Sequence, residues 1–175
     1  MISQQARNAL WTITKVLFAV LFVGWCATLL RRFDPKFGFG LPGWFRIAGF
    51  FIFGIGLFLI ALCGILLSTC GFGTPGHRLF PTEFIATGPF RYVRNPMSIG
   101  AILATLGWSL VNRSPSMLLA WLLLTLLIHL VVVYIEEPKL EKSFGASYRS
   151  YRTSVPRWLP KIKSSTQFQN GNKFE

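Results

Sequence analysis

The sequence predicts an all-α integral membrane protein with about four transmembrane helices and a C-terminal amphipathic surface helix. Of its 175 residues 52% are hydrophobic and only 14% are charged, whereas a soluble domain carries about 25% charged residues. The formal net charge is +12. In a chain with spanning segments, anionic lipid headgroups and basic cytoplasmic loops explain this excess better than nucleic acid does. We therefore expect membrane lipids as partners, and no nucleic acid.

Four apolar segments are the predicted spans, and they cover about residues 9–30, 47–67, 97–112 and 116–135. The third is shorter than the ~20 residues that usually cross a bilayer. A tight turn at Asn112-Arg113-Ser114-Pro115 follows it, so the third and fourth spans should form a helical hairpin. The second span contains glycines at spacings that let helices approach closely, and these are Gly49, Gly54, Gly56 and Gly64.

The rest of the chain divides around these spans into a single domain, residues 1–175. Residues 9–72 hold the N-terminal spans, and residues 73–160 hold the motifs described below. The connection over residues 68–96 is too rich in Gly and Pro for a long helix. Residues 164–175 are polar and predicted to be a flexible tail.

A surface helix is predicted beyond Pro138. Four apolar or aromatic side chains fall at helical spacing on one face: Leu140, Phe144, Tyr148 and Tyr151. Three cations lie off that face: Lys142, Arg149 and Arg152. This pattern predicts an amphipathic helix lying on the membrane surface with its aromatic side down. Pro156 ends the helix, and Trp158 is a candidate interface anchor.

An even number of spans places both termini and the 68–96 connection on one side of the membrane. Most of the Lys and Arg residues lie on that side, although Arg31 and Arg32 lie on the other. The positive-inside rule therefore predicts a multi-pass protein whose termini face the cytoplasm. In a bacterial host the membrane would be the cytoplasmic, inner one.

Charges of opposite sign stand at matched ends of the predicted hairpin. Arg91 and Arg94 precede the third span, and Glu136 and Glu137 follow the fourth. We expect these four side chains to line one cavity at the cytoplasmic face, because charge near hydrocarbon is costly unless it is paired or used. The alternative is simple anchoring of helix ends, with the acids paired to the arginines. S-adenosylmethionine carries both signs and fits such a site, and so does a zwitterionic phospholipid headgroup.

His129 lies seven residues before Glu136, nearly two helical turns, so the two are expected to share a face. Its other interpretation is a hydrogen-bond partner between helices. No metal site is predicted, because His77 is the only other histidine and no thiols cluster. The three cysteines are interpreted as small buried side chains, and these are Cys26, Cys63 and Cys70.

Several motifs between residues 73 and 160 carry a resemblance to a known family. They are Gly88-Pro89-Phe90-Arg91-Tyr92-Val93-Arg94-Asn95-Pro96-Met97, Glu136-Glu137-Pro138, Phe144-Gly145-x-x-Tyr148-x-x-Tyr151 and Val155-Pro156-Arg157-Trp158. In order and spacing they resemble the isoprenylcysteine carboxyl methyltransferase-like superfamily, which also includes membrane phospholipid N-methyltransferases. Two residues depart from the prenylcysteine enzymes: Asn95 stands in place of a His and Ser98 in place of a Tyr.

The resemblance implies a small multi-span enzyme that uses S-adenosylmethionine. The cofactor-binding residues it implies are Gly88, Arg91, Tyr92, Val93, Arg94, Asn95, Pro96, Glu136 and Glu137. The expected acceptor is the carboxylate of an isoprenylcysteine-like or other lipophilic molecule. Phospholipid N-methylation is the alternative, and a non-enzymatic membrane protein with a lapsed pocket is the second alternative.

Catalytic and acceptor-binding roles follow from the acceptor. A carboxylate is already ionised, and Arg157 is its expected counterion, although a lipid phosphate contact is the competing interpretation for this residue. An amine must first lose a proton, for which Glu137 or His129 is the candidate base. Tyr148 and Tyr151, with Arg157, are the expected acceptor-binding residues.

Overall fold

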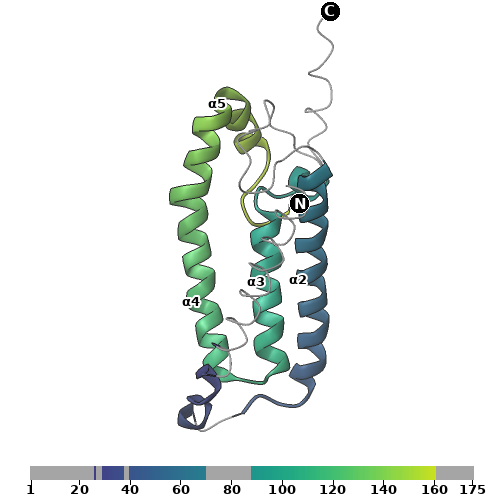
Figure 1. The fold of residues 1–175 in the computed structure, drawn as a ribbon, viewed down its shortest axis with the longest axis vertical. Coiled ribbons are helices and arrows are strands. Elements are labelled where there is room, and N and C mark those ends of the chain that lie inside the picture. Colours follow the sequence, from purple (N-terminus) through teal and green to yellow (C-terminus); the bar gives the residue numbers. More distant parts are fainter. Residues whose placement is uncertain (1–25, 27–28, 38–39, 70–87, 161–175) are drawn as a thin grey trace, which may run out of the picture.

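The described part of the chain is helical, with no strand. The computed structural model describes Cys26 and residues 29–37, 40–69 and 88–160, without the side chains of 67–69. Its elements are the 3-10 helix η1 (Asp34–Phe37), α2 (Trp44–Thr69), the 3-10 helix η2 (Gly88–Arg91), α3 (Pro96–Val111), α4 (Pro115–Val131), the π-helical turn η3 (Val132–Glu136) and α5 (Glu137–Ser154). Three long helices stand side by side and α5 folds over one end (Figure 1).

Among the described residues, two helices are long and apolar enough to cross a membrane. One is α2 over Trp44–Leu66, and the other is the continuous helix Pro115–Ser154, which is apolar only as far as Ile135. The second and fourth predicted spans coincide with them. The third coincides with α3, an apolar helix of 16 residues. The first predicted span lies almost wholly outside the described residues, so the count of four spans stays a prediction.

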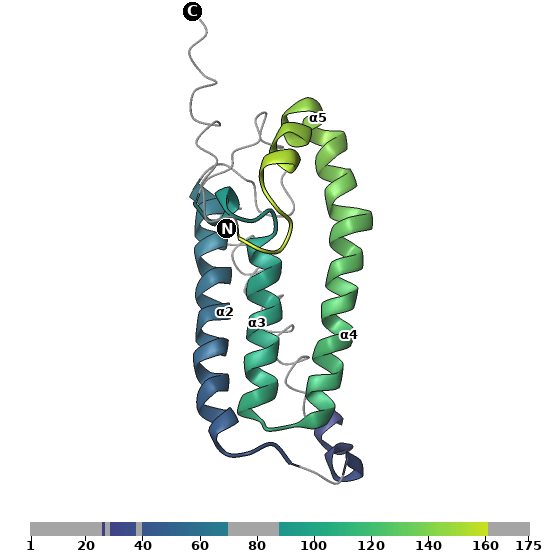
Figure 2. The same ribbon diagram turned by 180° about the vertical axis from the view of Figure 1, so that it is seen from behind.

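Small residues bring α2 and α3 together. A Cβ atom added to Gly49 would lie 2.6 Å from the Val111 nitrogen, and one added to Gly56 would overlap the Ala104 nitrogen. The two backbones are therefore in direct contact, as the glycine spacing predicted. Gly54, in contrast, has open space where its Cβ would stand. Figure 2 shows α3 lying beside α2 over the length of α3, whereas α4 stands further away.

The predicted tight turn joins α3 to α4, and Arg113 in it has a φ of +54°. Ser114 caps α4 by accepting a hydrogen bond from the Met117 amide, and its own hydroxyl donates to Asp34 at 2.8 Å. The indole N–H of Trp121 on α4 donates a hydrogen bond to the Ile102 carbonyl on α3 at 3.0 Å. These contacts hold α4 beside α3 and leave grooves on both sides of their seam.

The π turn η3 corrects one sequence prediction. The Glu137 amide donates to the Val132 carbonyl, five residues back, so this turn holds one more residue than an α-helical turn. The register consequently moves by about one residue, and Glu137 rather than Glu136 comes onto the face of His129. The proline at position 138 gives the cause, because its ring clashes with the carbonyl four residues earlier.

Helix α5 reverses direction at Gly145, whose φ is +54° and ψ −123°, a conformation open mainly to glycine. The predicted helix over residues 140–151 is therefore present, but in two pieces. Its aromatic face packs inside the fold: Tyr148 and Tyr151 are buried with Val155. A lipid-facing aromatic side is thus not what the structure contains, and the position of α5 on a membrane surface stays a prediction.

Candidate functional site

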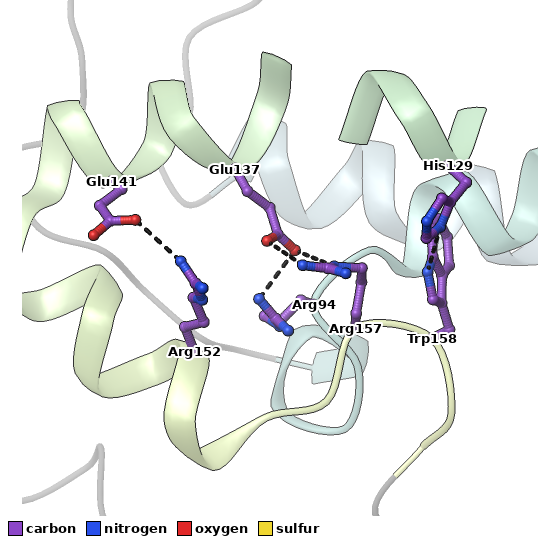
Figure 3. A network of polar contacts seen from close by, with 7 residues as sticks. All are labelled: Arg94, His129, Glu137, Glu141, Arg152, Arg157 and Trp158. Carbon is purple, nitrogen blue, oxygen red and sulfur yellow. Dashed lines mark hydrogen bonds and ion pairs between the residues drawn. The ribbon is translucent and has the colours of Figure 1, made fainter. Parts of the chain in front are cut away.

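Glu137 is the centre of the more deeply buried of two ion-pair clusters among the described residues. Its Oε1 accepts from Arg94 Nη1 at 3.0 Å and from Arg157 Nε at 2.7 Å, and its Oε2 accepts from Arg157 Nη2 at 2.8 Å. Only 5% of the Glu137 side chain and 10% of that of Arg94 are exposed. Figure 3 shows the two guanidinium groups converging on one carboxylate. The pair with Arg157 is bidentate, the strongest geometry for such a contact.

These cations keep Glu137 ionised. Burial alone would raise its pKa, but the hydrogen bonds from Arg157 and the charges of Arg94 and Arg157 outweigh burial and lower it. The neighbouring Tyr148 behaves oppositely, since burial and the Glu137 charge raise its pKa. The cluster therefore holds one carboxylate, two guanidinium groups and a neutral phenol at neutral pH.

Residues Val155–Pro160 form a C-terminal strap that connects the ends of α3 and α4. The amide of Arg94 donates to the Pro156 carbonyl at 2.9 Å, while Arg157 holds Glu137. The hydroxyl of Tyr151 donates to the Phe90 carbonyl at 2.6 Å, which fixes α5 on η2. The strap thus spans segments that are far apart in the sequence (Figure 2).

Trp158 of the strap contacts α4 through His129. Its indole Nε1–H donates to His129 Nδ1 at 3.1 Å, and the two ring centroids are 5.8 Å apart. Both side chains are half-buried. Figure 3 places this ring pair beside the arginine cluster, on the same side of the helix as Glu137.

Two buried donors at the start of α3 have no hydrogen-bond partner in the described structure: Arg94 Nε and Asn95 Nδ2. The side chain of Asn95 also makes no capping bond to α3, although it occupies the N-cap position. Because unpaired buried donors are costly, and because the amides of a helix N-terminus attract anions, this position suits an anionic acceptor group of a ligand.

Two apolar grooves flank the seam between α3 and α4. One, of about 390 Å³, is lined by Met97, Ser98, Ala101, Leu124, Leu127, Ile128, Val131, Val132 and Glu136. The other, of about 520 Å³, is lined by Ile102, Leu122, Leu123, Thr125, Leu126, His129 and Trp158. Both volumes are within the range of small-molecule sites. The first groove includes Met97 and Ser98 at the start of α3, and the second ends at the ring pair.

The structure brings together only part of the predicted site. Arg94 and Glu137 are in direct contact, but Glu136 is exposed and lines the first groove, while Arg91 forms no ion pair with either acid. The described residues therefore form no single cavity shared by all four charges. The physical reason is that adjacent residues of a helix point about 100° apart.

The remaining predicted residues lie around this cluster. Gly88 has a φ of +54°, Val93 and Pro96 are buried, and Tyr92 is exposed. Tyr148 and Tyr151 belong to the core beneath the strap, so their contact with an acceptor stays a prediction.

Sequence reasoning missed three features of this site. It assigned Arg157 to an acceptor carboxylate and did not foresee its pairing with Glu137. It did not identify the Trp158–His129 hydrogen bond, or Asn95 Nδ2 as a free buried donor. Pro138 directly after two acids was the available indication of the register change, because proline disturbs the preceding turn.

The fold and site define an all-helical protein with membrane-type helices and a buried Arg-Glu-Arg cluster at one end. The family model of phospholipid methyltransferases matches residues 44–147, and the chain belongs to this family, within the isoprenylcysteine methyltransferase-like superfamily of membrane methyltransferases. Searches of curated proteins and of solved structures gave no match. The family indicates a membrane methyltransferase, and such enzymes generally use S-adenosylmethionine.

Proposed function

We propose that this protein uses S-adenosylmethionine to methylate a carboxylate of a lipophilic acceptor at the membrane. The observation that carries the cofactor assignment is the pair of unpartnered buried donors, Arg94 Nε and Asn95 Nδ2. They suit the carboxylate of the cofactor's methionine moiety. Glu136, at the end of the adjacent groove, suits the ammonium group. When bound, S-adenosylmethionine supplies a methyl group on a sulfonium, a good electrophile.

The state of the candidate bases favours a carboxylate acceptor. Glu137 already accepts three hydrogen bonds from guanidinium groups, and a carboxylate with a lowered pKa is a weak base. A carboxylate acceptor needs no base because it is ionised at neutral pH. Arg157 holds Glu137 through Nε and Nη2, so its Nη1 is the donor through which we propose that it contacts the acceptor.

The acceptor's hydrocarbon would occupy the second groove. Its lining is almost entirely apolar, and its polar end lies at His129 and Trp158. A lipophilic molecule in that groove would place its polar head near the strap, where Arg157 and Trp158 are consecutive residues. An S-isoprenylated cysteine has this shape, a hydrocarbon chain with a carboxylate at one end.

The family match supports a second function, N-methylation of a phospholipid amine. That reaction needs a base, and the remaining candidate is Glu136, which lines the first groove and forms no ion pair with another described residue. For both functions we propose that the protein crosses the membrane several times and that its site faces the cytoplasm.

One experiment tests the cofactor and a second separates the acceptors. Isothermal titration of the purified protein with S-adenosylmethionine should give saturable heat; absence of binding would support a lapsed pocket. The protein is then incubated with cofactor labelled in the methyl group and with N-acetyl-S-farnesylcysteine or phosphatidylethanolamine vesicles. A methyl ester releases volatile methanol in alkali and a methylamine does not, so the released label identifies the bond formed.

A further inference from the structure

The hydrogen bond between Trp158 and His129 determines where the histidine carries its proton. A tryptophan indole can only donate. Because Trp158 Nε1 lies 3.1 Å from His129 Nδ1, that nitrogen must present its lone pair. The neutral imidazole then has its hydrogen on Nε2, since one ring nitrogen donates while the other accepts.

The same contact limits what His129 can do in a reaction. As a base, the ring must take a proton on a free lone pair. Its Nδ1 lone pair is held by Trp158, and its Nε2 already carries hydrogen. We propose that Trp158 is a positioning residue that holds His129 as a donor, so that its Nε2–H binds an anionic oxygen of the methyl acceptor. This inference rests on the proposed function and deepens it.

The surroundings of the ring support a ligand-directed donor. His129 lies in the 520 Å³ groove, where the side chain of Thr125 is the other polar group besides Trp158. That threonine donates its hydroxyl hydrogen to the Trp121 carbonyl at 2.9 Å. Among the described residues, His129 Nε2 has no hydrogen-bond acceptor. A molecule that enters this groove with an oxygen at its polar end therefore meets an imidazole N–H.

The strap is anchored through the two residues that precede Trp158. Arg157 is bonded to Glu137 by two hydrogen bonds, and the Pro156 carbonyl accepts from the Arg94 amide. These contacts fix the backbone that leads into Trp158 and so keep its indole within reach of His129. Such preorganised donors are effective because their orientation is set before the ligand arrives.

The inference is tested first without any reaction. Protein labelled with ¹⁵N-histidine, in a His77→Gln background so that His129 is the only histidine, is examined by NMR at a pH where the ring is neutral. We expect hydrogen on Nε2 in this protein, and a redistribution toward Nδ1–H in Trp158→Phe. Trp121→Phe, which removes a different indole hydrogen bond of α4, should leave the tautomer unchanged. Hydrogen on Nδ1, or no effect of Trp158→Phe, would overturn the proposal.

The second test uses two histidine variants with opposite defects. In His129→Gln the amide nitrogen can reach the position of Nε2 and donate, whereas in His129→Asn the amide oxygen can replace Nδ1 but nothing replaces the donor. We expect kcat/KM for N-acetyl-S-farnesylcysteine to fall about ten- to a hundredfold in His129→Asn, the value of one charged hydrogen bond, and to fall less in His129→Gln. Cofactor affinity should not change in either.

The outcomes distinguish this inference from the proposed function. If both variants lose activity equally, His129 is not a donor to the acceptor, although the protein is still a methyltransferase. If phosphatidylethanolamine is methylated and the His129→Asn defect appears there, the bound oxygen belongs to a phosphate. If no acceptor is methylated but Nε2 carries the hydrogen, the tautomer is supported and the proposed function is wrong.

Discussion

Glu137 determines how the residues of the candidate site are arranged, because both of its oxygens are bonded to arginine. A buried carboxylate with one such partner would still be expensive to desolvate. Two guanidinium groups with good geometry compensate for that cost. The same pairing explains why Arg157 is a clamp for the strap as well as a candidate acceptor contact.

The two arginines should differ in what their removal changes. Arg94→Ala removes the free Nε donor proposed for the cofactor, so affinity for S-adenosylmethionine should fall about ten- to a hundredfold. Arg157→Ala should instead raise the acceptor KM or lower kcat while cofactor affinity is kept. Arg157→Lys should recover only part, because lysine cannot form the bidentate pair. Titration calorimetry measures the cofactor affinity, and steady-state kinetics measures the acceptor KM and kcat. Equal losses of cofactor affinity in the two alanine variants would contradict this division of roles.

The lowered pKa of Glu137 predicts a pH-dependent contribution to stability. A carboxyl whose pKa is lower in the folded state stabilises that state fully above its ordinary value, here 4.5, and less as the pH falls through the folded value. Wild type should therefore melt higher than Glu137→Gln at neutral pH, and the difference should shrink below about pH 4.5. Fluorescence melting in detergent measures this, with the exposed Glu136→Gln as matched control. A difference that persists in acid would refute the explanation.

The helices, as elements, were predictable because hydrophobic runs and prolines mark them. Pro96 and Pro115 begin α3 and α4, within a residue of the predicted starts of these spans. What composition does not reveal is a departure inside a helix: the π turn before Pro138 and the reversal at Gly145 are local backbone changes in otherwise helical sequence. Both alter which side chains meet. Of the four charges expected in one cavity only Arg94 and Glu137 are in contact, and Glu137 rather than Glu136 shares the face of His129.

The close packing of α2 on α3 predicts a strong positional effect on the same helix. Gly56→Leu would place a side chain against the Ala104 backbone, which cannot move without separating the helices. We expect such overpacking to lower the free energy of unfolding by about 1–3 kcal/mol. Gly54→Leu is the matched control, since Gly54 is exposed with nothing within 4 Å of an added Cβ. Thermal melting of the two variants in one detergent compares them, and equal melting temperatures would contradict this interface.

The whole molecule has its candidate site at one end. The strap, α5, η2 and the start of α3 meet there, while the opposite end holds the tight turn and the contact between Asp34 and Ser114 (Figure 1). Sequence reasoning could place these groups at one end, because matched helix ends carry the charges. It could not predict that the strap closes over that end, because this depends on contacts between residues distant in the sequence, Pro156 with Arg94 and Trp158 with His129.

The asymmetry of the two ends gives a test of orientation. Lys142 and Arg149 are exposed on α5, and the positive-inside rule predicts that this end faces the cytoplasm. In a background with the three native cysteines replaced by serine, Lys142→Cys and Arg149→Cys should react with a membrane-impermeant maleimide only after the cytoplasmic side is opened. Arg113→Cys, in the exposed turn at the other end, should react in intact cells.

The three sites together test α4 as a crossing helix, because Arg113 precedes it and the other two follow it. Labelling of all three sites from one side would mean that α4 does not cross the membrane. The reverse pattern would mean that α4 crosses in the opposite orientation. The candidate site would then lie away from a cytoplasmic supply of cofactor.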